Sequence, residues 1–554
     1  MSLYPAILHA QKVVHKLVSQ DEIIDGCHAI LLVSHETPMR NDTDREMPHR
    51  PESNFYYLTG CDIPGSAVLI SFSYLSGNVQ DVKHQLFVPQ ADEDSKMWSV
   101  PPPSIEEASA LFETHFIQPI LSLQSTVSSL GSTHQIHTLP PTLLFPALPT
   151  FMNAYHSSKQ ASSASLLPAI HQARLTKTPF EIENMERANK ITSAAHEVVM
   201  RELGRFAGGR ASMRGIDGRP LDLGGQDWEI EGEGDAEALF TAVCRRGGSK
   251  HLSYMPIVAG GPRAATLHYI CNHQPFTHHL PTTLTSSSFS RSATSSSSSH
   301  HHSHDGATNG DAQAHAHDEP DPLDVNALRQ DWAPQVLLID AGTEWNCYGA
   351  DVTRTMPVGN GGKFTERSGE IYQLVLDMQK AAEEIIKAGI HWDTVHLLMH
   401  KILISNFLRL GIFQNGTEEE ILASGVSTGF FPHGLGHSIG LDVHDVPSAS
   451  KPATNPTIPA QSLENPQLYK FLRLRLPLEQ GMIITIEPGC YFSPHVLAPW
   501  RSSPFLNTSV LAEYEPMGGV RIEDVVLVEE KGIRNLTTAV RERKDVERLC
   551  SGEK

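Results

Sequence analysis

The sequence predicts a mixed α/β (α+β) chain with an N-terminal α/β domain followed by a larger second domain. Its 554 residues are too many for one ordinary hydrophobic core. Short apolar runs typical of buried strands alternate with stretches whose apolar residues recur every three or four positions, as in helices. We place the boundary at residue 173, so that the first domain spans 1–173 and the second spans 174–554.

Three apolar runs in the first domain predict buried strands at 29–33, 67–70 and 85–89. Ser104 stands two and three positions before Glu106 and Glu107, which is typical of a helix start. Residues 140–168 are rich in Pro and Ser with weak periodicity, and this composition indicates the approach to the domain boundary.

The second domain begins with a predicted helix at Thr178-Pro179, because Pro suits the first turn of a helix. Further runs predict strands at 336–339, 350–354, 481–486 and 520–528, and helices at 364–388 and 395–410. The strand at 520–528 would place Arg521, Glu523 and Val525 on one face.

Two stretches of the second domain are poor in large apolar residues, 208–234 and the Ser/His-rich 277–322. Neither can bury enough apolar surface to offset the entropy of ordering the chain, which is about 1 to 2 kcal/mol per residue. We expect surface insertions, the longer one disordered. Its histidines could bind metal, but we favour a spacer.

The composition argues against a membrane protein and against a nucleic-acid-binding protein. With 40% hydrophobic residues and no long uncharged apolar run, a membrane role is not indicated. The formal charge of -20 disfavours nucleic-acid binding. Seven scattered cysteines without a Cys-x-x-Cys pair suggest a reducing compartment, and the N-terminus has no continuous apolar signal. We expect a cytoplasmic protein.

Four short stretches carry side chains suited to metal binding. They supply four carboxylates, Asp340, Asp351, Glu487 and Glu523, and the imidazole of His437. Two neighbouring divalent cations repel each other unless anionic oxygens bridge them, and such a pair activates water for hydrolysis. Hard oxygen ligands with a single imidazole favour Mn(II), with Co or Zn also suitable. The set predicts a two-metal hydrolase.

Each ligand has a simpler interpretation when it is taken alone. Asp340 could cap a turn, and Glu487 could form a salt bridge with Arg521. Only one of His433, His437 and His444 is needed as a ligand. The other two could hydrogen-bond substrate or stabilise a developing oxyanion.

The ordered motifs resemble the pita-bread metallopeptidases, and more narrowly their proline-specific branch, the Xaa-Pro aminopeptidases (aminopeptidase P) and prolidase. The resemblance extends upstream to Arg174 with Lys177 and to 55–60 in the first domain. The motifs that carry it are Leu267-His268-Tyr269, Ile339-Asp340-Ala341-Gly342, Asp351-Val352-Thr353-Arg354, 433–437 with His444-Asp445, Thr485-Ile486-Glu487-Pro488-Gly489 and Val520-Arg521-Ile522-Glu523-Asp524.

The resemblance implies a function and a role for each matching position. Two Mn(II) ions per subunit would hold a bridging hydroxide that attacks the bond before proline in peptides with proline at the second position. Asp340 would chelate one ion, and Asp351 and Glu523 would bridge both. His437 and Glu487 would complete the second site, with Glu487 also moving the proton. His433 and His444 would bind substrate, supported by Arg521 and His268. The family's first domain often builds a homodimer.

Two alternatives stay open beside the aminopeptidase. Arg473 matches the place of a prolidase arginine that clamps the free carboxylate of a dipeptide, which favours a strict Xaa-Pro dipeptidase. The run 471–475 also fits an ordinary edge strand with solvated charges. A metal-free scaffold on the same fold is the remote alternative. Such proteins lack the carboxylate set, whereas this sequence has all five ligands.

Overall fold

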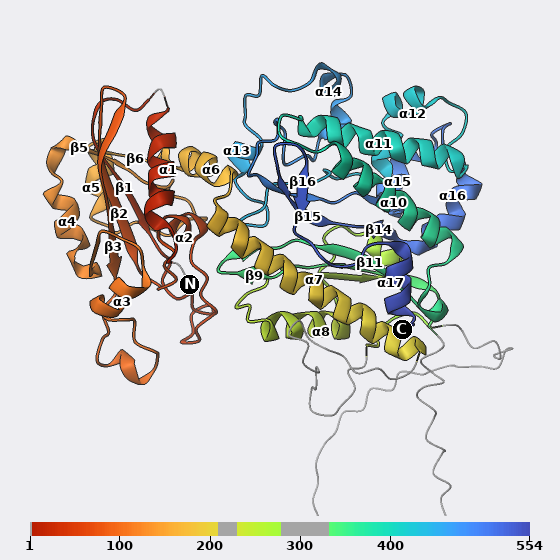
Figure 1. Ribbon diagram of the computed structural model, residues 1–554, viewed down its shortest axis with the longest axis horizontal. Coiled ribbons are helices and arrows are strands. Elements are labelled where there is room, and N and C mark those ends of the chain that lie inside the picture. The colour runs from red at the N-terminus through yellow and green to blue at the C-terminus, as the bar shows by residue number, and fades with distance from the viewer. Residues whose placement is uncertain (1–2, 21, 209–229, 279–331, 554) are drawn as a thin grey trace, which may run out of the picture.

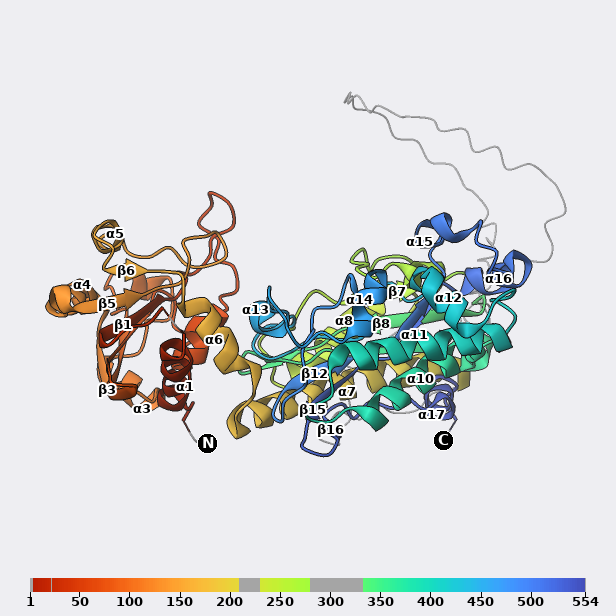
Figure 2. The ribbon, with the colours of Figure 1, turned by 90° about the horizontal axis from the view of Figure 1, so that it is seen from above.

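The structure is a computed structural model that describes residues 3–20, 22–208, 230–278 and 332–553. Two lobes lie side by side in Figures 1 and 2, an N-terminal lobe and a larger lobe that contains the C-terminus. Both combine sheets with covering helices, so the predicted α/β class is confirmed.

The N-terminal lobe is built on a six-stranded sheet with the order β4-β3-β2-β1-β5-β6. The predicted strands at 29–33, 67–70 and 85–89 are confirmed and are longer than predicted, and the helix after Ser104 is confirmed with a capping box. The strands are β1 (Gly26–Val33), β2 (Ala67–Leu75), β3 (Asn78–Val88), β4 (Phe116–Pro119), β5 (His134–His137) and β6 (Ala161–Ser162), and the helices are α1 (Ala6–Val18), α2 (Ser53–Thr59), α3 (Ile105–Leu111), α4 (Leu123–Ser129), α5 (Met152–Ser157) and α6 (Leu166–Leu175).

Strand β1 shows why this sheet carries helices on both faces. Ala29 and Leu31 pack with residues of α4 and α5, whereas Ile30 and Leu32 pack with residues of α1. Successive side chains of a strand point to opposite faces, so a continuous apolar run buries both.

The larger lobe surrounds several short sheets with helices. Its long helix α7 (Pro179–Gly208) starts where Thr178-Pro179 predicted and runs along the base of the lobe (Figure 1). The other helices are α8 (Glu233–Arg246), α10 (Glu366–Ile385), α11 (Trp392–Arg409), α12 (Glu418–Ser424), α13 (Pro447–Ser450), α14 (Ala460–Glu464), α15 (Pro494–Leu497), α16 (Thr508–Tyr514) and α17 (Arg543–Cys550).

The strands of this lobe form two three-stranded sheets, β11-β8-β7 and β12-β15-β16, and two short hairpin pairs, β10-β9 and β13-β14. They are β7 (Ile257–Gly260), β8 (Gln335–Asp340), β9 (Glu344–Trp345), β10 (Tyr348–Gly349), β11 (Thr353–Val358), β12 (Ile483–Ile486), β13 (Gly489–Tyr491), β14 (Gly519–Arg521), β15 (Asp524–Val528) and β16 (Ile533–Asn535).

Two predicted strands differ from the structure. The strand predicted at 350–354 starts only at Thr353, so Asp351 lies just before β11. The strand predicted at 520–528 is broken into β14, which pairs with β13, and β15, which pairs with β12. Ile522 and Glu523 lie in the gap between them, because the chain changes partner strand there. Arg521 and Glu523 still line the same cavity, whereas Val525 packs in an apolar cluster, so the predicted single face holds only for the first two residues.

The predicted insertions fall mostly outside the described residues. The described end of the first one, 230–234, is packed rather than exposed, since Ile230 and Glu233 are buried. The Glu233 carboxylate accepts hydrogen bonds from the Gly260 amide (2.8 Å) and the Tyr269 hydroxyl (2.8 Å), which compensates its burial. For the second insertion only Thr277 and His278 are described, so its predicted disorder and its histidine tract lie outside the described residues.

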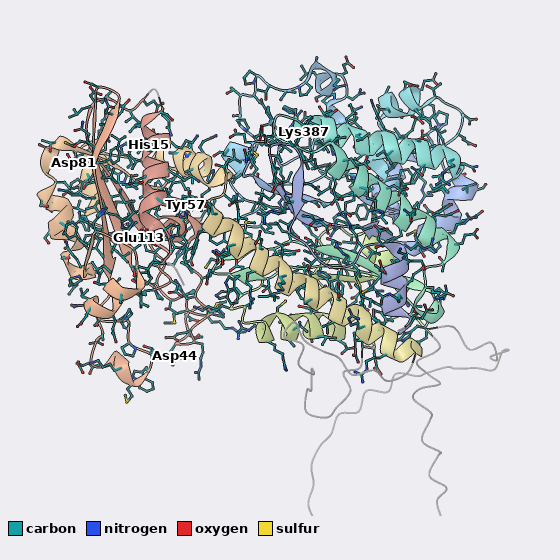
Figure 3. The ribbon with its side chains drawn as sticks, viewed as in Figure 1. His15, Asp44, Tyr57, Asp81, Glu113 and Lys387 are labelled. Carbon is teal, nitrogen blue, oxygen red and sulfur yellow. The ribbon has the colours of Figure 1, made fainter. Side chains whose placement is uncertain are left out.

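The junction between the lobes combines apolar packing with hydrogen bonds. One apolar cluster joins α1 and β1 of the first lobe to Tyr348 and Ile483 of the second. The Tyr4 hydroxyl lies 3.1 Å from the Tyr348 hydroxyl across this junction, and within the first lobe Tyr57, labelled in Figure 3, donates its hydroxyl to the Ala173 carbonyl (3.2 Å). Arg174 lies in the last turn of α6, so the boundary placed at 173 falls inside a helix and stays a prediction. Among the described residues no helix has the length and apolar character needed to cross a membrane.

Candidate metal centre

A cavity of about 930 Å³ opens in the larger lobe, and every site residue predicted from the sequence lines it. These residues are His268, Asp340, Asp351, His433, His437, His444, Arg473, Glu487, Arg521 and Glu523. They come from six separate parts of the chain. The structure therefore brings together the whole predicted set in one place.

Two pairs of strands deliver the four carboxylates. Asp340 ends β8 opposite Thr353 of β11, and Asp351 stands two positions before β11. In the second pair, Ile486 of β12 opposes Asp524 of β15 and Gly489 of β13 opposes Arg521 of β14. Both chains of that ladder are interrupted at the same level, where Glu487 and Glu523 lie.

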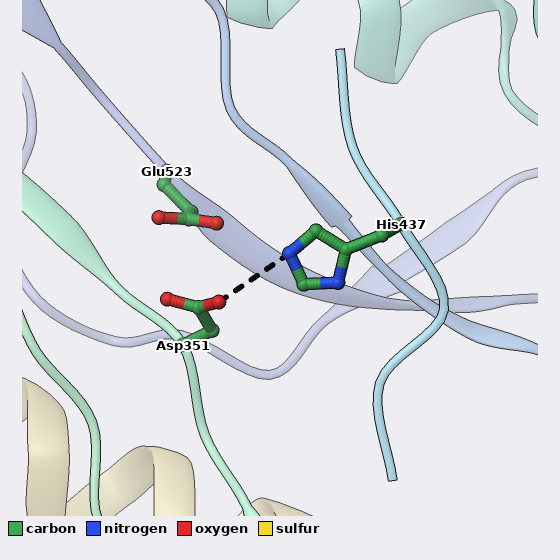
Figure 4. A group of neighbouring side chains, drawn as sticks. All are labelled: Asp351, His437 and Glu523. Carbon is green, nitrogen blue, oxygen red and sulfur yellow. Dashed lines mark ion pairs between the residues drawn. The ribbon is translucent and has the colours of Figure 1, made fainter. Parts of the chain in front are cut away.

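Asp351, His437 and Glu523 form the compact centre of the site (Figure 4). One ligand atom from each lies within 4.8 Å of the others, and all three residues are buried. The His437 Nε2 atom is 3.4 Å from Asp351 Oδ2 and 3.5 Å from Glu487 Oε1. Three carboxylates and one imidazole nitrogen thus face a common point.

His437 is held in the tautomer that a metal ligand needs. Its Nδ1 lies 3.1 Å from the Ser438 carbonyl, which can only accept, so Nδ1 carries the proton. Nε2 then presents its lone pair to Asp351 and Glu487. The backbone fixes the loop, since the His437 amide donates to Thr485 Oγ1 (3.1 Å) and the Thr485 amide donates to the His437 carbonyl (2.9 Å).

Arg521 and His433 are oriented by Tyr491. The Tyr491 hydroxyl accepts from Arg521 (2.9 Å) and lies 2.8 Å from His433 Nε2. Arg521 also donates to Asp340 Oδ2 (2.5 Å), so its partner is Asp340 rather than Glu487. The alternative of a simple Glu487–Arg521 salt bridge is wrong for this reason. His433 Nδ1 lies 3.7 Å from Glu487 Oε2.

Sequence reasoning missed three residues that hold the carboxylates. The Tyr254 hydroxyl contacts both Asp340 and Asp351, at 2.5 Å from Asp351 Oδ1. Thr353 donates to Glu523 Oε2 (2.6 Å) and accepts from Arg521 Nε (3.0 Å). The third residue is Tyr491, which orients Arg521 and His433. Thr353 stood inside a recognised motif, and Tyr491 follows one closely. Tyr254 stood alone, without a sequence pattern that could have found it.

His268, His444 and Arg473 lie at the outer part of the cavity and are exposed. The His444 ring meets His437 edge to face, with centroids 4.5 Å apart. Residues 471–475 form turns and irregular chain, so the alternative of an edge strand at Arg473 was wrong. Arg475 Nε donates to Asp393 Oδ1 (3.2 Å), whereas Arg473 forms no ion pair with any described residue.

Burial controls the charges in this centre. It raises the pKa of Asp340, Asp351 and Glu523, and it raises that of Glu487 to about 8, with the charges of Asp351 and Asp340 adding to the effect. Burial also lowers the pKa of His437 to about 4 and of His433 to about 3. The carboxyl groups therefore resist ionisation together unless cations join them.

The donor set fits divalent cations. Arg521 supplies one positive charge against four carboxylates, and the imidazoles are neutral. Carboxylate oxygens with one imidazole nitrogen, at mutual distances near 3.5 Å, suit a hard or borderline divalent metal. The described residues hold no cysteine in this group, which disfavours a closed structural zinc site.

Two family models match the chain. The one described as metallopeptidase family M24 matches residues 183–530, and the one described as aminopeptidase P, N-terminal domain, matches residues 9–139. They fall on the larger and the N-terminal lobe respectively.

Curated relatives cover the whole chain. Probable Xaa-Pro aminopeptidases of Podospora anserina and Tuber melanosporum are 33% and 31% identical to it, over 99% of this chain and 97% of each relative. Among solved structures, aminopeptidase P from Escherichia coli with the inhibitor Pro-Leu has a TM-score of 0.67 at 22% identity, covering 99% of both chains. Aminopeptidase PepP of Pseudomonas aeruginosa has a TM-score of 0.66 at 22% identity, covering 100% of this chain and 99% of that one.

Metal removal should destabilise the protein more strongly as pH rises. A carboxyl group whose pKa is raised by folding stabilises the folded state below its ordinary pKa and loses that contribution as pH rises through the folded value. For Glu487 this window runs from about 4.5 to about 8. We expect the Tm of chelated protein to fall below that of Mn(II)-loaded protein by on the order of 5 °C at pH 8, and by less at pH 6.

Differential scanning fluorimetry at both pH values measures this gap. Buried neutral histidines elsewhere, such as His196 and His396, affect both samples alike and cancel in the difference. A gap that is equal at both pH values, or larger at pH 6, contradicts the electrostatic interpretation.

Proposed function

The chain belongs to metallopeptidase family M24, and we propose on that premise that it is an Xaa-Pro aminopeptidase. The M24 match covers more than half of the chain, and the predicted pita-bread fold and proline-specific resemblance are confirmed by the matches over both lobes. The enzyme would remove the first residue from peptides that carry proline at the second position.

The observation that carries this proposal is the carboxylate cluster inside the cavity. All five expected ligands line the cavity, and one ligand atom from each of Asp351, His437 and Glu523 lies within 4.8 Å of the others, which also argues against a metal-free scaffold. We propose two Mn(II) ions per subunit, which Asp340, Asp351, His437, Glu487 and Glu523 would hold. When bound, such a pair lowers the pKa of a shared water and polarises the substrate carbonyl.

The surrounding side chains would handle the substrate and its protons. Glu487 lies 3.7 Å from His433 and 3.5 Å from His437, in position to accept a proton and to pass it to the departing proline nitrogen. His433, whose ring nitrogens lie 2.8 Å from the Gly434 carbonyl and 2.8 Å from the Tyr491 hydroxyl, would line the substrate site, and His444 would bind substrate. Arg521 would hold Asp340 in place, and His268 would contact the peptide from the rim.

The cavity has an acidic floor and a basic mouth. Arg473, Lys451 and Lys470 line it, and none of them forms an ion pair with a described residue. The mouth suits a carboxylate on the peptide substrate. The unpaired Arg473 is the specific observation that favours the second candidate, an Xaa-Pro dipeptidase. The cavity volume of about 930 Å³ and the lysines beyond Arg473 favour longer peptides.

We also propose a cytoplasmic homodimer. All seven cysteines are free thiols, as expected in a reducing compartment. Met97, Trp98 and Val100 in the first lobe are 76%, 81% and 93% exposed, an apolar surface that favours self-association. A monomer at micromolar concentration in sedimentation, or a protein found in the secreted fraction, contradicts these proposals.

A side-by-side assay separates the two candidate activities. With Mn(II), the purified protein should release the first residue of Arg-Pro-Pro with a higher kcat/KM than that for Gly-Pro, because the mouth accommodates the added residue. Arg473→Gln should lower kcat/KM for Gly-Pro more than for Arg-Pro-Pro. Cleavage of Gly-Pro alone would establish the dipeptidase, and cleavage of neither would refute the function.

Replacing Glu487 by Gln should separate catalysis from folding. The amide keeps the shape of the side chain but cannot accept the proton, so we expect kcat to fall by about 10²- to 10⁴-fold. Circular dichroism and Tm of the Mn(II)-loaded variant should stay near wild type. Near-normal turnover would rule out the proton-transfer role.

A further inference from the structure

Arg50 belongs to the N-terminal lobe but binds mainly to the larger one. It stands just before α2, and its side chain is 28% exposed. Nε donates to Glu344 Oε1 (2.8 Å), and one terminal nitrogen donates to the carbonyls of Cys347 (3.3 Å) and Leu441. The other terminal nitrogen stays within the first lobe and donates to Ser53 Oγ (3.2 Å).

The partners of Arg50 belong to two segments that flank site residues. Glu344 and Cys347 lie in the β9–β10 hairpin, which separates Asp340 from Asp351. Leu441 lies in the segment 438–445, which follows His437 and contains His444. One guanidinium thus ties the hairpin to this segment, beside the backbone bond from the Gly349 amide to the Gly440 carbonyl (2.8 Å).

A second contact reaches the segment through Ser53. Ser53 Oγ, which accepts from Arg50, donates to Asp442 Oδ1 (2.6 Å). The other carboxylate oxygen of Asp442 accepts from Arg174 (2.8 Å). The N-terminal lobe therefore holds both the backbone and a side chain of the segment.

The His444 side chain has few contacts of its own, and its backbone is also anchored one residue further on, where Asp445 accepts from Arg174 (2.5 Å) and Lys177 (3.0 Å). The His444 ring is exposed and forms no hydrogen bond with the described residues, apart from its edge-to-face contact with His437. The place of such a ring is set by the backbone that carries it. A displacement of about 1 Å in a catalytic site can cost on the order of 10²-fold in rate.

We propose that Arg50 is a positioning residue of the active site, which holds the segment 438–445 so that His444 faces the substrate. The inference rests on the proposed function, because activity is its readout. Arginine suits this position since its planar fork can reach one carboxylate and two carbonyls at once, whereas a lysine ammonium is a single point donor.

A double-mutant cycle tests whether Arg50 acts through His444. In the Mn(II)-loaded enzyme, Arg50→Ala should lower kcat/KM for an Xaa-Pro peptide by about 10- to 100-fold. In the His444→Ala background the same change should cost less than about threefold, because the residue it positions is gone. Equal losses in both backgrounds overturn the proposal, as does an Arg50→Ala enzyme within about twofold of wild type.

Two further variants separate positioning from stability. Arg50→Lys keeps a positive charge beside Glu344, whose burial raises its pKa to about 7. It should therefore keep wild-type Tm and metal content and still lose activity, with the same dependence on His444. Full activity of Arg50→Lys also overturns the proposal. Arg45→Ala, on the exposed part of the same loop, is the matched control and should match wild type. If wild type itself cleaves no Xaa-Pro peptide, the proposed function fails instead.

Discussion

Four carboxyl groups in one buried place form the constraint on which the rest of the site depends. Each loses hydration on burial, and each lies near other acids, so the cluster is unfavourable unless positive charge enters it. Arg521 compensates only part of this charge. The neutral tautomer of His437, the tyrosine contacts to Asp340 and Asp351, and the threonine contact to Glu523 all follow from the same need to hold acids close together.

The backbone provides that closeness through interrupted strands. β12 and β13 run past β15 and β14, and both chains break at the level of Glu487 and Glu523. Glu487 and Glu523 therefore lie outside the regular ladder, whereas Asp340 ends a strand. The hairpin β9–β10 has a similar role, because it allows Asp340 and Asp351 to meet although eleven positions separate them. The N-terminal lobe then supports the mouth of the cavity through Arg50, Ser53 and Arg174.

The chemistry of the site was more predictable from the sequence than its geometry. Asp340, Glu487 and Glu523 each follow apolar residues, and a carboxylate next to a buried strand needs a partner, which made them recognisable. The break at Ile522-Glu523 was not predictable, because the apolar residues Val520 and Val525 on either side of it fit one strand and the change of partner strand is a tertiary effect. Tyr254 and Arg50 were missed for the same reason, since their contacts join segments that lie about 90 to 390 positions apart.

The metal content of the folded protein tests the central claim most directly. Protein purified with Mn(II) and freed of unbound ions should contain about two metal ions per chain by elemental analysis, and Asp351→Asn should contain fewer while it stays folded. Wild-type protein that is folded, with a single thermal transition, and yet holds no stoichiometric metal would contradict the account.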